Sequence, residues 1–176
     1  MNAADDLLVE QGFTATTIEG IAARAGVAKQ TIYRWWKSKV DILLDALVDD
    51  AREGLAWADP AGTPAEDLTS HLRRVAAFFQ EPAGQVLQAL LGHARLDKDT
   101  AVALRDRFLR DQRERDVAGL SAILERHLGE APQHETVDRL VDLLLGPVSY
   151  RILVLGAPVD EDLVQATVRA VLQPAD

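Results

Sequence analysis

Residues 16–39 constrain the fold of this chain more than any other segment, because they encode two short helices joined by a tight turn. Four apolar residues recur at helical spacing and form one apolar stripe: Ile18, Ile21, Ala22 and Ala25. Gly26 follows this stripe, where a helix often ends on a left-handed residue. Thr16 stands three residues before Glu19, so we expect these two side chains to form a capping box on the first helix.

The second helix of this segment has a polar outer face. Ile32 and Trp36 are four residues apart and are expected to pack on the first helix, while Val27 fills the turn. The remaining face carries donors and no acid: Lys29, Gln30, Tyr33 and Arg34. This layout is typical of a helix-turn-helix, whose second helix enters the major groove of DNA.

These residues resemble the DNA-binding domain of the TetR family of transcriptional regulators. The matching residues keep their order and spacing: Gly12-Phe13, Thr16-Thr17, Ile21-Ala22, Ala25-Gly26-Val27, Thr31-Ile32-Tyr33, Trp36 and Ser38-Lys39, with a looser match over Gly146-Pro147-Val148-Ser149-Tyr150-Arg151. The resemblance implies an all-α fold of about nine helices, with an N-terminal helix-turn-helix three-helix domain and a C-terminal helical bundle that regulates it. It also implies a repressor that binds a palindromic operator as a homodimer and is released by a small-molecule effector.

The expected contacts with DNA lie on and around the second helix. Lys29, Gln30 and Arg34 are expected to reach base edges or nearby phosphates. Other residues would mainly position the DNA backbone: Thr16, Thr17, Thr31, Tyr33, Trp35, Lys37 and Lys39. Replacing Lys39 by Ala is therefore expected to weaken binding to all duplexes.

The sequence departs from the family pattern at two places. Ala28 stands where the family usually has a serine that caps the recognition helix, and loss of such a cap costs about 1 kcal/mol. Residues 1–11 begin inside the first helix, where relatives carry a longer and often basic segment. We expect the first turn to fray, and a basic extension before Met1 to strengthen non-specific DNA binding.

The net charge of −9 argues against nucleic acid only superficially. Five basic residues against four acidic ones give residues 1–40 a charge of +1, so the rest of the chain carries −10. All five basic side chains lie between Arg24 and Lys39, a stretch without an acid. A local basic patch is what phosphate binding requires.

No pattern in the sequence predicts an enzyme, a metal site or a cofactor. Cysteine is absent, no segment is apolar enough to span a membrane, and a cytoplasmic protein is expected. The four histidines have no spacing typical of zinc ligands: His71, His93, His127 and His134.

Turn residues divide the rest of the chain into helices. The clearest break is the Pro- and Gly-rich run over residues 59–64. Long helices are expected over residues 41–57, 97–128 and 135–155, with a kink at Pro147. We expect a DNA-binding domain over residues 1–46 and a ligand-binding and dimerisation domain over residues 47–176.

Two further sites are expected in the second domain. A small hydrophobic or amphipathic effector would contact residues from several helices: Phe78, Phe79, Leu91, His93, Phe108, Leu144 and Val148. Residues 135–155 are apolar on more than one face, which predicts burial on more than one face. The resemblance implies that the last two helices form the dimer interface: Val141, Leu145, Val148, Ile152, Leu155, Leu163, Ala166, Thr167 and Ala170.

Other interpretations of the chain stay open at this point. Each proposed effector or dimer residue is also compatible with an ordinary place in the core. The missing cap at Ala28 and the short start are compatible with a helical ligand-binding or interaction protein of the same fold that has lost specific DNA binding. Salt-dependent affinity for DNA would discriminate between these functions.

Overall fold

The computed structural model describes residues 3–173, and all regular structure in that range is helical, which confirms the predicted all-α class. The elements are α1 (Ala3–Ala15), α2 (Ile18–Ala25), α3 (Lys29–Trp35), α4 (Lys39–Gly54), α5 (Pro64–Phe78), α6 (Pro82–Ala94), α7 (Lys98–Leu104), the π-helix η1 (Arg105–Leu109), α8 (Arg110–Leu128), α9 (His134–Ser149), the π-helix η2 (Tyr150–Val154) and α10 (Glu161–Leu172). No helix among these described residues is both long and apolar enough to cross a membrane.

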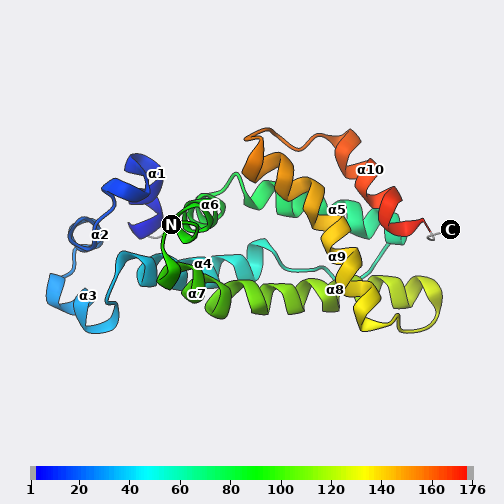
Figure 1. The fold of residues 1–176 in the computed structure, drawn as a ribbon, viewed down its shortest axis with the longest axis horizontal. Coiled ribbons are helices and arrows are strands. Elements are labelled where there is room, and N and C mark those ends of the chain that lie inside the picture. The colour runs from blue at the N-terminus through cyan, green and yellow to red at the C-terminus, as the bar shows by residue number, and fades with distance from the viewer. Residues whose placement is uncertain (1–2, 174–176) are drawn as a thin grey trace. The chain divides into compact units, whose positions relative to one another are not determined.

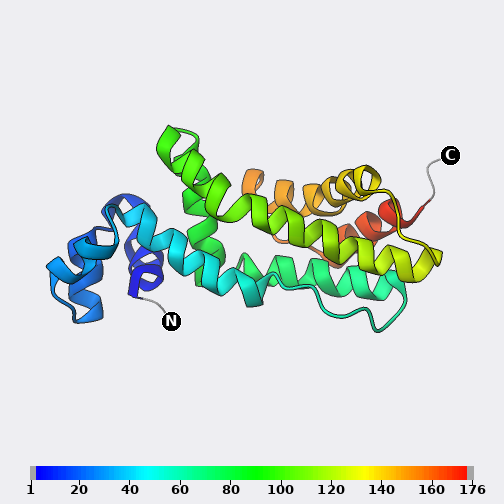
Figure 2. The ribbon, with the colours of Figure 1, turned by 90° about the horizontal axis from the view of Figure 1, so that it is seen from below.

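The first compact unit comprises described residues 3–54 and 78–110. Figure 1 shows its helices α1, α2 and α3 in blue, and Figure 2 shows α6, in green, crossing α4, in cyan. Helix α6 packs against both α1 and α4. Pro82 occupies the first turn of α6, where its missing N–H would have no partner in the helix. Since α1 also belongs to the helix-turn-helix domain, α6 contacts that domain through α1.

A close backbone approach fixes where α6 begins. A Cβ atom on Gly84 would lie 2.1 Å from the carbonyl oxygen of Phe78 and 2.5 Å from the Cα of Phe79. Only a glycine fits at this position without a backbone shift. The side chain of Gln88 adds a hydrogen bond to the Phe79 carbonyl at 3.1 Å, which ties α6 to the end of α5.

The second compact unit comprises residues 55–77 and described residues 111–173. Its centre is apolar and fully buried, with Leu120, Val141 and Leu144 each at 0% exposure. Arg113 of α8 donates to Asp138 and Asp142 of α9. Arg73 of α5 forms a bidentate ion pair with Glu161 of α10. These ion pairs are exposed or half-buried, so apolar burial contributes most of the stability of this unit.

Most helices agree with the sequence-based boundaries within a few residues, and the break over residues 59–64 is confirmed. The predicted long helix over residues 97–128 contains the π-helical segment η1. Pro147 lies inside α9, and η2 follows three residues later. The two compact units divide the chain differently from the expected functional boundary at residue 46, because residues 78–110 pack with the first unit.

Candidate nucleic-acid interface

The α2–turn–α3 segment has the local geometry that its sequence predicts at Gly26 but not at its start. Gly26 is left-handed, with φ 68°, and its N–H closes the end of α2. The cap of α2 is Thr17, whose Oγ1 accepts from the Gly20 N–H at 3.0 Å. The predicted capping box between Thr16 and Glu19 is therefore wrong, because Thr16 donates instead to the Gly12 carbonyl at 2.9 Å.

Glu19 links α2 to α3 rather than capping α2. The Tyr33 hydroxyl donates to Glu19 Oε1 at 2.8 Å. This hydrogen bond lowers the pKa of Glu19 and raises the pKa of Tyr33. Arg24 at the end of α2 donates to both carboxylate oxygens of Glu10 on α1. The two contacts join the three helices at their exposed edges. Arg24 and Tyr33 therefore already have hydrogen-bond partners within the domain.

The outer face of α3 carries the predicted polar set. Its side chains are exposed: Lys29, Gln30, Thr31, Tyr33 and Arg34. Trp35 is 70% exposed, and the Arg34 guanidinium lies 5.8 Å from its ring centroid. Ala28 at the start of α3 makes no side-chain cap bond. Lys37 is also exposed, so the donors on this side of the domain are accessible.

Two residues of the predicted DNA-binding set make contacts within the domain. Thr16 is buried at 1% exposure. The Lys39 ammonium donates to the carbonyls of Phe13 and Thr16 at the end of α1, the latter at 3.0 Å. It also lies 4.2 Å from the centre of the Phe13 ring, and burial lowers the pKa of Lys39. Lys39 therefore joins α4 to the end of α1, and Thr16 is buried at this junction.

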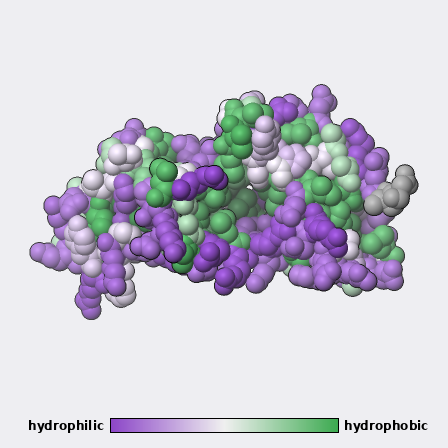
Figure 3. Space-filling model, in the orientation of Figure 1, coloured by the Kyte–Doolittle hydropathy of each residue, from purple (hydrophilic) through white to green (hydrophobic). Residues whose placement is uncertain are grey.

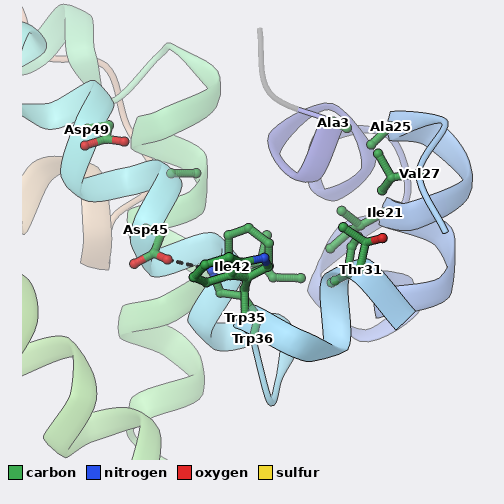
Figure 4. Close-up of a pocket in the computed structure, with 12 residues that line it drawn as sticks. Ala3, Ile21, Ala25, Val27, Thr31, Trp35, Trp36, Ile42, Asp45 and Asp49 are labelled. Carbon is green, nitrogen blue, oxygen red and sulfur yellow. Dashed lines mark hydrogen bonds between the residues drawn. The ribbon is translucent and has the colours of Figure 1, made fainter. Parts of the chain in front are cut away.

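A cavity of about 450 Å³ lies beside the recognition helix. Figure 4 shows that Ile21, Ile42 and the two tryptophans line it, with Trp36 donating to Asp45 of α4. Ile32 is buried as predicted, whereas Trp36 lies beyond the end of α3 in extended backbone. The expectation that Trp36 faces α2 from the same helix is therefore corrected. Val27 is 43% exposed and does not fill the turn as expected.

The predicted effector residues are distributed over both compact units. Those in the first unit are Phe78, Phe79, Leu91, His93 and Phe108, and those in the second are Leu144 and Val148. All except Leu91 and His93 are buried. The His93 ring lies 4.5 Å from the Phe13 ring at the end of α1. His93 therefore connects α6 to the helix-turn-helix, a contact that its position on an apolar helix did not reveal.

The predicted dimer residues fall on two opposite faces of the last helices. Four of them point into the interior of their own unit, so they are not available to a partner chain: Val141, Val148, Ile152 and Thr167. Leu145 and Leu163 are half-buried, and Leu155, Ala166 and Ala170 are exposed. Four exposed apolar residues were missed, although intervals of seven, three and four from Leu143 to Tyr150 and from Tyr150 onward mark a second stripe: Leu143, Tyr150, Leu153 and Val154. Figure 3 shows hydrophobic surface over the end of α9 and η2.

The second unit also holds a buried polar cluster that the sequence did not indicate. The indole of Trp57 stacks on His71 at 3.6 Å between ring centroids and donates to Asp116 at 3.1 Å. Burial lowers the pKa of His71 to about 4 and raises the pKa of Asp116.

Comparison with known proteins assigns both parts of the chain. Residues 1–46 match the model of bacterial regulatory proteins of the tetR family. Residues 58–171 match the tetracyclin repressor-like C-terminal domain. The HTH-type transcriptional regulator YdeS of Bacillus subtilis is 33% identical over 94% of this chain and 82% of its own length. A similarly named regulator of Mycobacterium tuberculosis is 30% identical over 96% of this chain and 82% of its own length.

Solved structures agree with this assignment. A TetR-family regulator structure from Mesorhizobium loti shares the fold with a TM-score of 0.69 and 18% identity, over 97% of this chain and 91% of its own. A TetR regulator from Agrobacterium tumefaciens has a TM-score of 0.65 and 25% identity, over 97% and 89%. The matching families are transcriptional regulators and not enzymes, which confirms that prediction. Because a family model covers most of the chain and close relatives match nearly all of it, the chain belongs to the TetR family of bacterial transcriptional regulators.

Proposed function

We propose that this regulator is a repressor that binds a palindromic operator as a homodimer and is released by a small-molecule effector. The observation that carries the proposal is the outer face of α3. Lys29, Gln30 and Arg34 are exposed there, and among the described residues none of the three forms a hydrogen bond or an ion pair with another side chain. Uncommitted donors on a recognition helix are the groups that read base edges and phosphates.

The proposed roles differ along the interface. Lys29, Gln30 and Arg34 would reach base edges and nearby phosphates. Other exposed residues would position the DNA backbone: Thr17, Thr31, Tyr33, Trp35 and Lys37. A protein with these contacts would act in the cytoplasm, where the chromosome is accessible.

Replacing Gln30 by Ala is expected to weaken binding to the selected operator by about 10-fold, because a bidentate base contact is worth about 1–3 kcal/mol. Affinity for random DNA should hardly change, since phosphate contacts supply it. The operator is first selected from a random duplex pool, and affinities are then measured by fluorescence anisotropy. Gln133→Ala is the control, because Gln133 is exposed on the second unit. Equal affinities of both variants for the operator would show that Gln30 reads no base.

The exposed apolar stripe on α9 and η2 supports the proposed dimer. We infer that Leu143, Tyr150 and Leu153 meet their symmetry mates, together with Ala166 and Ala170 of α10, because large apolar surface exposed by a monomer often marks a protein interface. Two-fold symmetry would then place two recognition helices on the two half-sites of a palindrome.

Leu153→Asp is expected to convert a dimer at micromolar concentration into a folded monomer, because the charge would be buried against the partner. Light scattering gives the mass, and circular dichroism checks the fold. Leu96→Asp provides the control, since Leu96 is an 89% exposed leucine of the other unit. A dimeric Leu153→Asp protein, or a monomeric wild type, would contradict the proposed interface.

We also propose that a small-molecule effector binds to residues that the sequence analysis predicted. In the first unit, apolar surface for a small hydrophobic or amphipathic molecule would come from Phe78, Phe79, Leu91 and Phe108. One solved protein of this fold is named the flavonoid-responsive regulator FrrA, with 22% identity, a TM-score of 0.63 and coverage of 97% of this chain and 89% of its own. Its name supports a small-molecule effector for a protein of this fold. An effector could shift the equilibrium between a DNA-binding and a non-binding conformation only by its differential affinity for these two conformations.

A further inference from the structure

Arg107 of the π-helix η1 joins two carboxylates that lie one turn apart on α4. Its guanidinium donates to Asp41 at 3.0 Å and also to Asp45. The next residue, Phe108, is buried at 2% exposure, and η1 packs against α4. Arg107 therefore extends from a segment that is anchored in the core of the first unit and binds α4 near its start.

Each of the two carboxylates also holds the connection between the recognition helix and α4. Asp45 accepts from the indole Nε1 of Trp36 at 2.5 Å, as Figure 4 shows. Asp41 accepts from the backbone N–H of Ser38 at 3.1 Å and from its hydroxyl at 2.9 Å. Trp36 closes the end of α3, and α4 begins directly after Ser38. Arg107 is thus linked through one carboxylate to each end of this connection.

Loss of Arg107 would leave the two carboxylates without a common cation. Asp41 and Asp45 are four residues apart on one helix, and like charges at this spacing repel each other. The side chain of Asp45 is 53% exposed, so it could then turn into solvent and leave the Trp36 indole. An exposed ion pair contributes little to stability. The consequence of this one is the direction in which both carboxylates point.

The contact also links the two matched parts of the chain. Arg107 lies within residues 58–171, which match the C-terminal domain model, whereas Asp41 and Asp45 lie within residues 1–46, which match the DNA-binding model. All three residues belong to the first compact unit. A residue of the C-terminal domain therefore contacts the segment from which α3 is held.

We propose that Arg107 is a positioning residue for DNA binding. By fixing Asp45 and Asp41, it fixes Trp36 and Ser38, and with them the orientation in which α3 is presented to the major groove. This role acts through the two carboxylates and requires no contact between Arg107 and DNA. It rests on the proposed function in one respect, namely that α3 reads the operator.

Arg107→Gln is expected to weaken binding to the selected operator about fivefold more than its matched control, within the range for residues that act on a site without touching its ligand. The control is Arg105→Gln, because Arg105 is an exposed arginine of the same π-helix and pairs with the adjacent Asp106. Both variants lose one positive charge, so their affinities for random DNA should stay equal. Fluorescence anisotropy on both duplexes measures the operator-to-random ratio, which should fall in Arg107→Gln alone.

The indole N–H resonance of Trp36 reports its position without DNA. Nitrogen-15 NMR of the full chain resolves the indole groups, and Trp36→Phe assigns the resonance. In Arg107→Gln this resonance should move upfield, because the indole proton loses a charged acceptor. In Arg105→Gln it should stay in place. A general loss of stability would not move this single resonance in a folded protein.

Asp45→Asn provides a second route to the same contact. Its amide oxygen can still accept from Trp36, but it cannot form the ion pair with Arg107. We expect this variant to lower the operator-to-random ratio as well. The double variant should lose less than the product of the two single losses, because both substitutions remove the same contact.

Three results would overturn the proposal. The first is an equal operator-to-random ratio in Arg107→Gln and Arg105→Gln. The second is a Trp36 resonance that is unmoved or shifts downfield in Arg107→Gln, which would mean that Asp45 keeps its place without the arginine. The third is a double variant whose loss equals the product of the single losses. A wild type that selects no duplex would contradict the proposed function instead, and the Trp36 resonance alone would then decide whether Arg107 holds this connection.

Discussion

Gly84→Ala is expected to lower the free energy of unfolding of the first unit by about 3 kcal/mol, the upper range for an overpacked site. The added methyl group would lie 2.1 Å from the Phe78 carbonyl oxygen and 2.5 Å from the Phe79 Cα. These are backbone atoms, so no side-chain rotation relieves the clash. Helix α6 would have to move away from the end of α5.

Gly92→Ala is the matched control in the same helix. A Cβ atom at Gly92 meets nothing within 4 Å, and alanine is favoured over glycine inside a helix by up to about 1 kcal/mol. The two substitutions should therefore change stability in opposite directions. Urea unfolding followed by circular dichroism at one protein concentration measures both effects. Equal midpoints for the two variants would mean that α6 is not held closely against residues 78–79.

The same pair of variants tests the support of the DNA-binding domain. Helix α6 packs on α1 and α4, and His93 of α6 contacts Phe13 of α1. Displacement of α6 by Gly84→Ala should consequently weaken operator binding at temperatures where the protein is still folded. Gly92→Ala should bind the operator like the wild type.

Lys39→Ala is expected to destabilise the helix-turn-helix domain by about 2 kcal/mol, because hydrogen bonds to a charged group are worth more than neutral ones. The Lys39 ammonium donates one hydrogen bond to the Phe13 carbonyl and another to the Thr16 carbonyl, both at the end of α1. Removing it leaves partly buried carbonyls without a partner. Thermal unfolding monitored by circular dichroism measures the loss.

Lys37→Ala separates the structural role of a lysine from its electrostatic role. Lys37 is exposed two residues away, and its removal should change stability by less than about 0.5 kcal/mol. Its loss should instead reduce the slope of log affinity against log salt by about 0.9 for one lost phosphate contact. If Lys39→Ala left stability unchanged and altered only the salt slope, Lys39 would contact phosphate after all. The carbonyl contacts would then be dispensable.

The sequence determined the helical class, the turn at Gly26 and the polar face of α3. These features depend on neighbours within a few residues: the period of apolar side chains, the left-handed φ that glycine tolerates, and the absence of acids between Arg24 and Lys39. The exposed positions on α3 could be predicted for the same reason. A short amphipathic helix has only one way to turn its apolar side inward.

Tertiary structure alone decided which groups are free. Residues 135–154 are apolar on two sides, so periodicity could not tell that Val148 faces the interior while Leu153 faces outward. The Lys39 ammonium is hydrogen-bonded to carbonyls about 25 residues earlier in the chain. Burial and hydrogen bonding of these groups depend on segments distant in sequence, and no local pattern encodes which segments those are.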